Sequence, residues 1–184
     1  MPVTTTTNVL AGTKTYLAGN LEFSEDSLNW RDEVEGELSK INITCLSPIK
    51  VTFENQALET QADRARLKSL RQKGQWNEVA SYMKEVIKKD LRLIDLSDFV
   101  IFNFEFDKPT FGTIHELVIA EQQRKPVFCT CRNLKAVPLW IMGLIEKKYF
   151  YKDISSIIEK IKRINSGEHL INSDRWRLLK GDLR

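Results

Sequence analysis

A carboxylate stands close behind a run of apolar residues in the stretch Gly-Thr-Ile-His-Glu-Leu at residues 112–117. The apolar run, residues 99–102, predicts a buried strand, and an apolar helical segment follows up to residue 125. Glu116 is therefore expected in the first turn of a helix, just beyond the carboxyl end of a parallel strand, where open α/β sheets bind ligands. The alternative interpretation is that Glu116 only complements the helix dipole.

Two further polar elements are expected at the same edge of the sheet. The first is the loop after the first predicted strand, which holds Gly19 and Asn20. The second is an acidic helix end with Asp90, Asp95 and Asp98. Together with the turn around residues 110–116, they would border the crevice where the topology of a doubly wound sheet switches.

A carboxylate in such a crevice suits the cleavage of a bond between a sugar and a base. Bond breaking creates an oxocarbenium-like carbon, which a carboxylate can trap as an ester while a second acid helps the base to leave. Gly112 would let the backbone approach a sugar closely, and Thr110 and Thr113 offer hydroxyl and amide donors. Many α/β proteins meet these requirements, so the residue types alone leave the function open.

The elements that must position these groups alternate between short apolar runs and segments of helical periodicity. This alternation predicts an α/β fold, a flavodoxin-like doubly wound parallel sheet of four or five strands with helices on both faces. Strands are expected at residues 15–18, 41–45, 99–104, 126–131 and 149–151, and helices at 24–38, 76–94, 113–124, 137–145 and 153–164.

Length and composition favour one soluble domain. The chain has 184 residues, of which 42% are hydrophobic and 29% charged. We divide it into a polar N-terminal arm (residues 1–13), a domain (14–164) and a C-terminal tail (165–184). The net charge of +3 is small and the basic residues are scattered, so we expect no nucleic acid partner.

No apolar run reaches the length that a membrane span needs, and the first residues lack the features of a signal peptide. The three cysteines, Cys45, Cys129 and Cys131, match neither zinc nor thioredoxin spacing. We interpret them as reduced and mostly structural, and we therefore expect a cytoplasmic protein without a membrane partner.

Several segments together resemble the nucleoside 2-deoxyribosyltransferase family. They are Tyr16-Leu-Ala-Gly19, Trp30-Arg31, Asp90-Leu91, residues 94–100, residues 112–116, Ala120 and residues 125–127. The resemblance covers roughly residues 14–130, and the step of 26 residues from Asp90 to Glu116 also fits the family.

The resemblance implies a role for each matching residue. Glu116 would be the nucleophile that attacks the anomeric carbon, Asp90 would assist protonation of the leaving base, and Tyr16 would orient Glu116. Gly19 and Asn20 would line the sugar site. Such enzymes transfer deoxyribose between bases through a covalent intermediate, so we expect a small nucleoside or nucleotide as substrate, no cofactor and no metal. A homo-oligomer is also expected, because a neighbouring subunit usually completes the pocket in this family.

One position departs from the family pattern. Thr110 stands six residues before Glu116, where the classical transferases place an aspartate that holds the sugar 5′-hydroxyl. A hydroxyl here is more similar to the related deoxynucleoside 5′-monophosphate N-glycosidases. It removes a charge that would repel phosphate, and Ser24 and Ser27 could add donors for an anion. A hydrolase of 5′-monophosphates is thus an alternative to the transferase, and a non-catalytic nucleotide-binding sensor is a third hypothesis.

Other residues of chemical interest receive structural interpretations. Trp30, Trp140, Cys129 and Cys131 are assigned to the core, with base stacking as an alternative for Trp140. His115 is assigned to a structural or exposed position, and Asp95 and Asp98 to helix ends or turns. Lys88 and Lys89 are assigned to a solvated surface, with the alternative that a lysine near Asp90 steers a phosphate, and a solvated helix end is the alternative for Asp90 itself.

Overall fold

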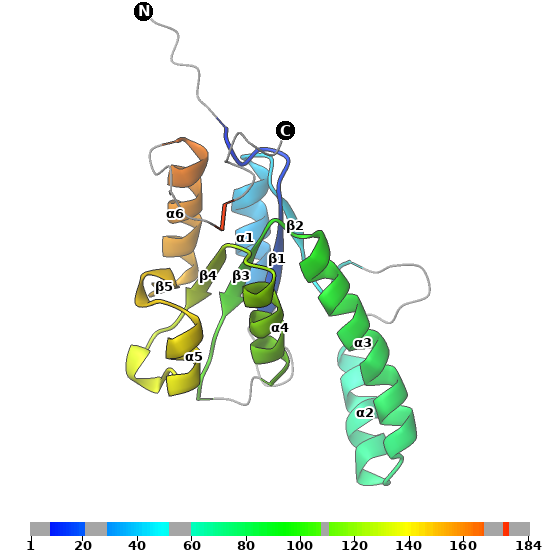
Figure 1. Ribbon diagram of the computed structural model, residues 1–184. Helices are drawn as coiled ribbons and strands as arrows, with labels where there is room; N and C mark the ends of the chain where they lie inside the picture. Colours follow the sequence, from blue (N-terminus) through cyan, green and yellow to red (C-terminus); the bar gives the residue numbers. More distant parts are fainter. Residues whose placement is uncertain (1–7, 21–28, 52–59, 108–110, 168–174, 177–184) are drawn as a thin grey trace, which may run out of the picture.

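The computed structural model of the chain describes residues 8–20, 29–51, 60–107, 111–167 and 175–176, and its centre is a parallel sheet (Figure 1). The strand order is β2-β1-β3-β4-β5. This is the flavodoxin-like order, so the predicted doubly wound fold is confirmed, with five strands. The strands are β1 (Lys14–Gly19), β2 (Thr44–Leu46), β3 (Phe99–Asn103), β4 (Val127–Thr130) and β5 (Phe150–Tyr151).

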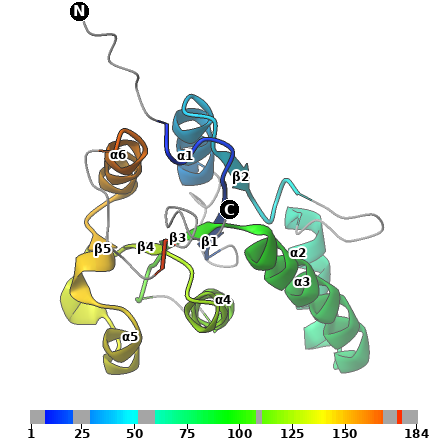
Figure 2. The ribbon, with the colours of Figure 1, turned by 45° about the horizontal axis from the view of Figure 1, so that its top comes forward.

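Helices cover both faces of the sheet, as Figure 2 shows in a view turned toward its top. Helices α1 and α6 lie on one face, and α3, α4 and α5 lie on the other. The helices are α1 (Asn29–Ser39), α2 (Gln61–Gln72), α3 (Trp76–Leu96), α4 (Phe111–Gln122), α5 (Leu139–Leu144) and α6 (Ile154–Asn165), with short 3-10 turns η2 (Leu134–Ala136) and η3 (Lys147–Tyr149).

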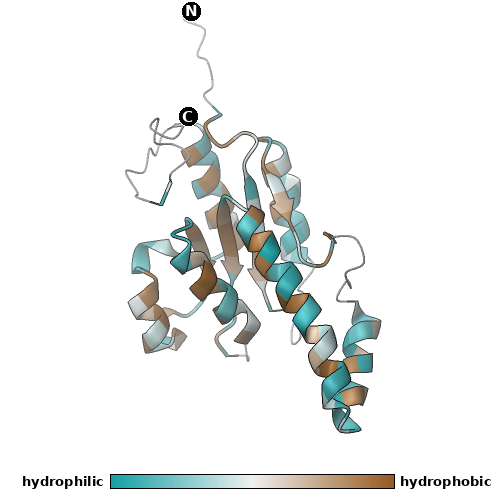
Figure 3. Ribbon diagram, turned by 45° about the vertical axis from the view of Figure 1, so that its right-hand side comes forward, coloured by the Kyte–Doolittle hydropathy of each residue, from teal (hydrophilic) through white to brown (hydrophobic). Residues whose placement is uncertain are grey.

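The central strands are apolar on both sides because both faces of the sheet are buried. In β1, Tyr16 faces the layer of α3 and α4, and the next residue, Leu17, faces the layer of α1 and α6. Tyr16 pairs with Val100 in β3, whose neighbour Ile101 again faces the opposite layer. Figure 3 shows this apolar centre in brown, surrounded by helices with mixed surfaces. The alternation places the hydroxyl of Tyr16 on the α3 and α4 side.

Helices α2 and α3 form a hairpin that projects from the body of the molecule (Figure 1). Thr60 caps α2, accepting a hydrogen bond from the Asp63 amide at 3.1 Å. Gly74 has a φ of 72° between the two helices, in the left-handed region that favours glycine after a helix. No residue of α2 is buried, whereas α3 buries Val86 and Leu93 near the sheet. The second half of α3 is therefore the part that belongs to the core.

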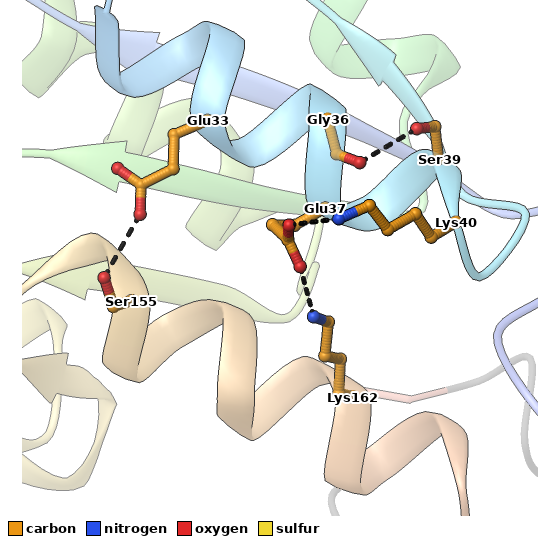
Figure 4. Close-up of polar contacts among 7 residues, drawn as sticks. All are labelled: Glu33, Gly36, Glu37, Ser39, Lys40, Ser155 and Lys162. Atoms are coloured by element: carbon orange, nitrogen blue, oxygen red, sulfur yellow. Dashed lines mark hydrogen bonds and ion pairs between the residues drawn. The ribbon is translucent and has the colours of Figure 1, made fainter.

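The layer of α1 and α6 is joined by polar contacts at its surface (Figure 4). The Ser155 hydroxyl donates to Glu33 at 3.1 Å, and Glu37 pairs with both Lys162 and Lys40. The Ser155–Glu33 and Lys162–Glu37 contacts cross between the helices above an apolar seam, whereas Lys40 pairs with Glu37 within one turn. Ion pairs at the surface contribute little to stability individually.

Residues close to both ends of the chain also enter the core. Leu10 is fully buried, and its amide donates to the side chain of Asn165 at 2.9 Å. Trp176 is 3% exposed, and its ring centroid lies 5.6 Å from that of Phe99 and 6.1 Å from that of Phe128. The boundaries of the arm and the tail remain a prediction, but these two side chains pack against the domain.

Two aromatic residues that were predicted for the core have different environments. Trp30 is 8% exposed and packs under β1, as predicted. Trp140 is 78% exposed, so its assignment to the core is wrong. The reason is the length of α5: this helix has six residues and directs only Ile141 inward.

All three cysteines are free thiols in the structure. Cys129 and Cys131 are buried, which confirms their assignment to the core, and burial raises the pKa of Cys129 well above its ordinary value. Within the described ranges, none of the helices combines the length and the apolar composition of a membrane span.

Candidate active site

Three side chains from three elements meet at the carboxyl edge of the sheet. The Tyr16 hydroxyl, from β1, donates a hydrogen bond of 2.7 Å to Oε1 of Glu116, on α4. Asp90, on α3, lies close enough for its charge to act on Tyr16. The contact between Tyr16 and Glu116 joins residues that are 100 positions apart in the chain. The structure therefore brings together the three residues to which the family resemblance assigned catalytic roles.

Tyr16 holds its proton firmly in this environment. Its side chain is fully buried, and burial is the largest cause that raises its pKa well above the usual value. The charges of Glu116 and Asp90 and the hydrogen bond to Glu116 raise the pKa further, and Arg31 opposes them. Tyr16 is thus a neutral donor across the physiological pH range, and it fixes the position of one carboxylate oxygen of Glu116.

Glu116 lies deeper in its helix than the sequence analysis expected. Helix α4 begins at Phe111, so Glu116 is in the second turn and the first turn contains no acidic residue. The expected first-turn position is therefore wrong. Because the helix dipole acts mainly within the first turn, the interpretation of Glu116 as a dipole-complementing residue loses its basis. Its hydrogen bond to the buried Tyr16 accounts for its position instead.

Asp90 has a buried lysine as its neighbour. Lys89 is fully buried, and its Nζ lies 3.5 Å from Oδ1 of Asp90 and donates to the Pro48 carbonyl at 2.7 Å. The prediction of a solvated surface holds for Lys88, which is exposed, and is wrong for Lys89. The burial of Lys89 was not predicted, although Lys89 lies three residues after the buried Val86, on the same helical face.

The end of β1 is fixed by a buried arginine. Arg31 is fully buried and donates to the carbonyls of Leu17, at 3.3 Å, and Gly19, at 3.0 Å. A Cβ atom at Gly19 would lie 3.0 Å from the Trp30 ring and 3.3 Å from the Asn103 carbonyl, so only glycine fits there without displacing a neighbour. The family resemblance implies a place for Gly19 at a sugar site, and the packing of Gly19 gives a second reason for its identity.

The other predicted substrate-binding residues occupy different environments. Asn20 follows the end of β1 and is 8% exposed. Thr113 lies near the start of α4 and is 5% exposed. Gly112 is exposed, and a Cβ atom there would meet nothing within 4 Å. Among the residues that the structure describes, no contact therefore requires glycine at this position. His115 is exposed, as predicted. Thr110, Ser24 and Ser27 lie outside the residues that the structure describes.

Asp95 and Asp98 lie at the opposite, amino edge of the sheet. Asp98 precedes β3 and accepts a hydrogen bond of 2.7 Å from the Lys14 amide, where β1 begins. Asp95 accepts one of 2.7 Å from the Gln123 side chain. Their predicted location in the crevice with Asp90 is wrong, because α3 continues for six residues after Asp90 and returns to the start of β3. Their predicted structural roles are correct.

A cavity of about 280 Å³ lies at this amino edge, away from Tyr16 and Glu116. Its polar groups contact one another within the chain: Lys125 donates to the carbonyls of Asp95 and Ser97, and Arg175 pairs with Glu121. We therefore locate the candidate site by its chemistry, at the carboxyl edge. The described residues contain no group of three His, Cys, Asp or Glu side chains that could hold a metal ion.

Comparison with known proteins gives a consistent picture. A family model described as nucleoside 2-deoxyribosyltransferase matches residues 15–154. A solved 2-deoxyribosyltransferase from the psychrotolerant bacterium Bacillus psychrosaccharolyticus is 21% identical, with a TM-score of 0.51, over 79% of this chain and 90% of that chain. A conserved protein from Enterococcus faecalis V583 is 15% identical, with a TM-score of 0.53, over 84% of this chain and 99% of that chain. At these identities the two structures show a shared fold. No curated protein matches the sequence.

Proposed function

Because the chain belongs to the nucleoside 2-deoxyribosyltransferase family, we propose that it cleaves the N-glycosidic bond of 2′-deoxynucleosides and transfers the deoxyribosyl group to another base. The family binds nucleosides, and its activity is enzymatic. The residues that would carry the reaction in this chain are Glu116, Asp90 and Tyr16.

In the first half-reaction, a carboxylate oxygen of Glu116 attacks the anomeric carbon of the sugar. The carbon–nitrogen bond breaks, its electron pair goes to the base, and Asp90 assists the protonation of that base. In the second half-reaction, a nitrogen of the incoming base attacks the same carbon, its proton passes to Asp90, and the bond between the carbon and Glu116 breaks. Tyr16 remains protonated and holds Glu116 in the attacking orientation.

The single observation that carries this proposal is the hydrogen bond of 2.7 Å from the buried Tyr16 to Glu116. Two carboxylates beside one buried hydroxyl group repel each other, which is unfavourable for stability and favours a functional reason for the arrangement. A nucleophile needs such a fixed orientation, because positioning of reacting groups supplies a large part of the rate enhancement of enzymes.

The alternative activity is hydrolysis of deoxynucleoside 5′-monophosphates. Thr110 favours this activity, because it is a neutral residue at a position where the classical transferases have an aspartate. A neutral side chain there does not repel a phosphate group. The chemistry of Glu116 is the same in both reactions, and water replaces the acceptor base in the hydrolase. A third possibility, a nucleotide-binding sensor without activity, predicts binding of the same ligands with no bond cleavage.

One experiment separates the three functions. The full chain is incubated with 2′-deoxynucleosides and their 5′-monophosphates, each with and without a second free base, and chromatography follows the free and exchanged bases. We expect base exchange with nucleosides. Release of base from monophosphates without exchange supports the hydrolase, and binding without either product supports the sensor.

The matched control is Glu121→Gln, since Glu121 lies on the same helix but pairs with Arg175 at the other edge. It should keep the activity that Glu116→Gln loses. Full activity in Glu116→Gln would overturn the assignment of the nucleophile.

A further inference from the structure

Lys89 is a fully buried lysine beside a proposed catalytic carboxylate. Its ammonium group donates to the Pro48 carbonyl at 2.7 Å and lies 3.5 Å from Oδ1 of Asp90, whose side chain is 13% exposed. Burying a lysine is costly unless its charge is paired and hydrogen-bonded. The hydrogen bond to Pro48 connects α3 to the segment after β2. That structural role does not require the second contact of Lys89, the one with Asp90.

The pairing matters because several charged or titratable groups gather here. Asp90 and Lys89 lie on α3, Glu116 on α4 and Tyr16 on β1, with Arg31 of α1 also acting on Tyr16. Both carboxylates act on Tyr16, so both lie near it. Asp90 and Glu116 are both partly buried, and two carboxylates near each other disfavour the ionised form of both. A positive charge in contact with Asp90 counteracts this effect.

We propose that Lys89 is a positioning residue that keeps Asp90 ionised and fixed in place beside the hydrogen-bonded pair of Tyr16 and Glu116. The catalytic consequence of this inference rests on the proposed function. The effect on the ionisation of Asp90 rests only on the contact between Lys89 and Asp90. Through Asp90, Lys89 sets the pH at which this group gains the proton that it passes to the leaving base.

The sign of the effect follows from the charge of Lys89. A cation next to a carboxylate favours the ionised form, so the protonated form of Asp90 is confined to lower pH. Without that cation, protonated Asp90 persists to higher pH. In a variant that lacks the charge of Lys89, the rate of a step that needs protonated Asp90 would therefore be maintained to higher pH.

The test uses Lys89→Gln in the full chain, because glutamine keeps a hydrogen-bond donor and removes the charge. Lys88→Gln is the matched control, since it removes the same charge from an exposed neighbour on the same helix. Carbon-13 NMR of labelled aspartate carboxyls, assigned with Asp90→Asn, follows the titration of Asp90. We expect the titration midpoint of Asp90 to rise by about one pH unit or more in Lys89→Gln and to stay unchanged in Lys88→Gln.

An unchanged midpoint in folded Lys89→Gln would overturn the proposal. If that variant does not fold, the native chain decides. Because the two groups are in contact, the nitrogen-15 signal of the Lys89 ammonium should shift at the titration midpoint of Asp90. A Lys89 signal that does not respond to the titration of Asp90 would contradict the proposal.

Base release in the same proteins separates this inference from the proposed function. If the native chain releases base, the alkaline limb of its kcat/KM profile should move by about one pH unit or more toward higher pH in Lys89→Gln. A role confined to structure would lower the rate equally at every pH. If the native chain releases no base, the proposed function fails, and the NMR titration still decides the role of Lys89.

Discussion

The two edges of the same sheet use acidic residues in different ways. At the amino edge, Asp98 accepts a hydrogen bond from the Lys14 amide, and Glu121 pairs with Arg175. At the carboxyl edge, Glu116 accepts a hydrogen bond from the buried Tyr16, whose pKa is also raised by the charge of Asp90. The acids of the amino edge join elements of the chain, whereas those of the carboxyl edge are gathered around one buried hydroxyl group. The contacts of an acidic residue, and not its place at a sheet edge, indicate its function.

The largest expected difference between the edges concerns the two glutamates of α4. Glu116→Gln should lower base release about 10³-fold or more, because it removes the nucleophile. Glu121→Gln should leave activity unchanged and lower the free energy of unfolding by about 1–2 kcal/mol, because Arg175 loses a charged partner. Steady-state kinetics and denaturant unfolding of both variants measure these effects. Equal loss of activity in both would remove the distinction between the edges.

A smaller difference is expected between two aspartates of α3. Asp90→Asn should lower kcat about 10²-fold, which is the contribution typical of general acid–base catalysis. Asp95→Asn, five residues later on the same helix, should keep the rate because its side chain accepts a hydrogen bond from Gln123 at the amino edge, away from Tyr16 and Glu116. Single-turnover measurements of base release are suited to both. A slow Asp95→Asn would show that the amino edge affects the chemistry.

Tyr16→Phe tests the hydroxyl group that organises the carboxyl edge. It keeps the ring in the core and removes the hydrogen bond to Glu116, so kcat/KM should fall about tenfold to 100-fold while the fold persists. Kinetics and circular dichroism provide the two measurements. Unchanged kinetics would mean that Glu116 does not need this donor.

The raised pKa of Tyr16 also predicts the pH dependence of stability. The folded state keeps this proton at a pH where the unfolded state, with an ordinary tyrosine pKa of about 10, has lost it. The contribution is complete below about pH 10 and is lost as the pH rises further. The melting temperature of the native chain should therefore fall more between pH 9 and about 11 than that of Tyr16→Phe. Parallel curves for the two proteins would contradict this assignment.

The smallest effect is expected at the surface seam of α1 and α6 (Figure 4). Hydrogen bonds from Lys162 and Lys40 lower the pKa of Glu37 to about 2. Because the folded pKa is lowered, this contribution is present above the ordinary glutamate value and is lost as the pH falls toward 2. Glu37→Gln should therefore leave stability near pH 7 almost unchanged and reduce its loss between about pH 4.5 and 2. Thermal melts at both pH values measure the difference.

The sequence predicted the fold well because its signals are local. Residues 99–102 are apolar on both faces, which only a central strand requires, and α6 has its isoleucines at helical spacing. Predicting which residues meet in the site required information beyond local patterns. The contact of Tyr16 with Glu116 spans 100 positions, and only the family resemblance, not periodicity, linked these residues.

The errors have physical reasons that local patterns do not contain. Trp140 is exposed because α5 is too short to bury two faces, and Asp98 lies at the amino edge because α3 runs past Asp90 to the start of β3. Lys89 was missed because residue type was given more weight than helical position. Its spacing from Val86 and Leu93 would have placed it on the buried face.

The central claim is that Glu116 forms a covalent bond with the sugar. The most direct measurement is mass spectrometry of the full chain, quenched in acid after rapid mixing with a 2′-deoxynucleoside and digested to peptides. We expect a deoxyribosyl adduct on Glu116, formed at the rate of base release and absent from Glu116→Gln. Release of base by the native chain with no adduct at any time point, and with equal release by Glu116→Gln, would contradict the claim.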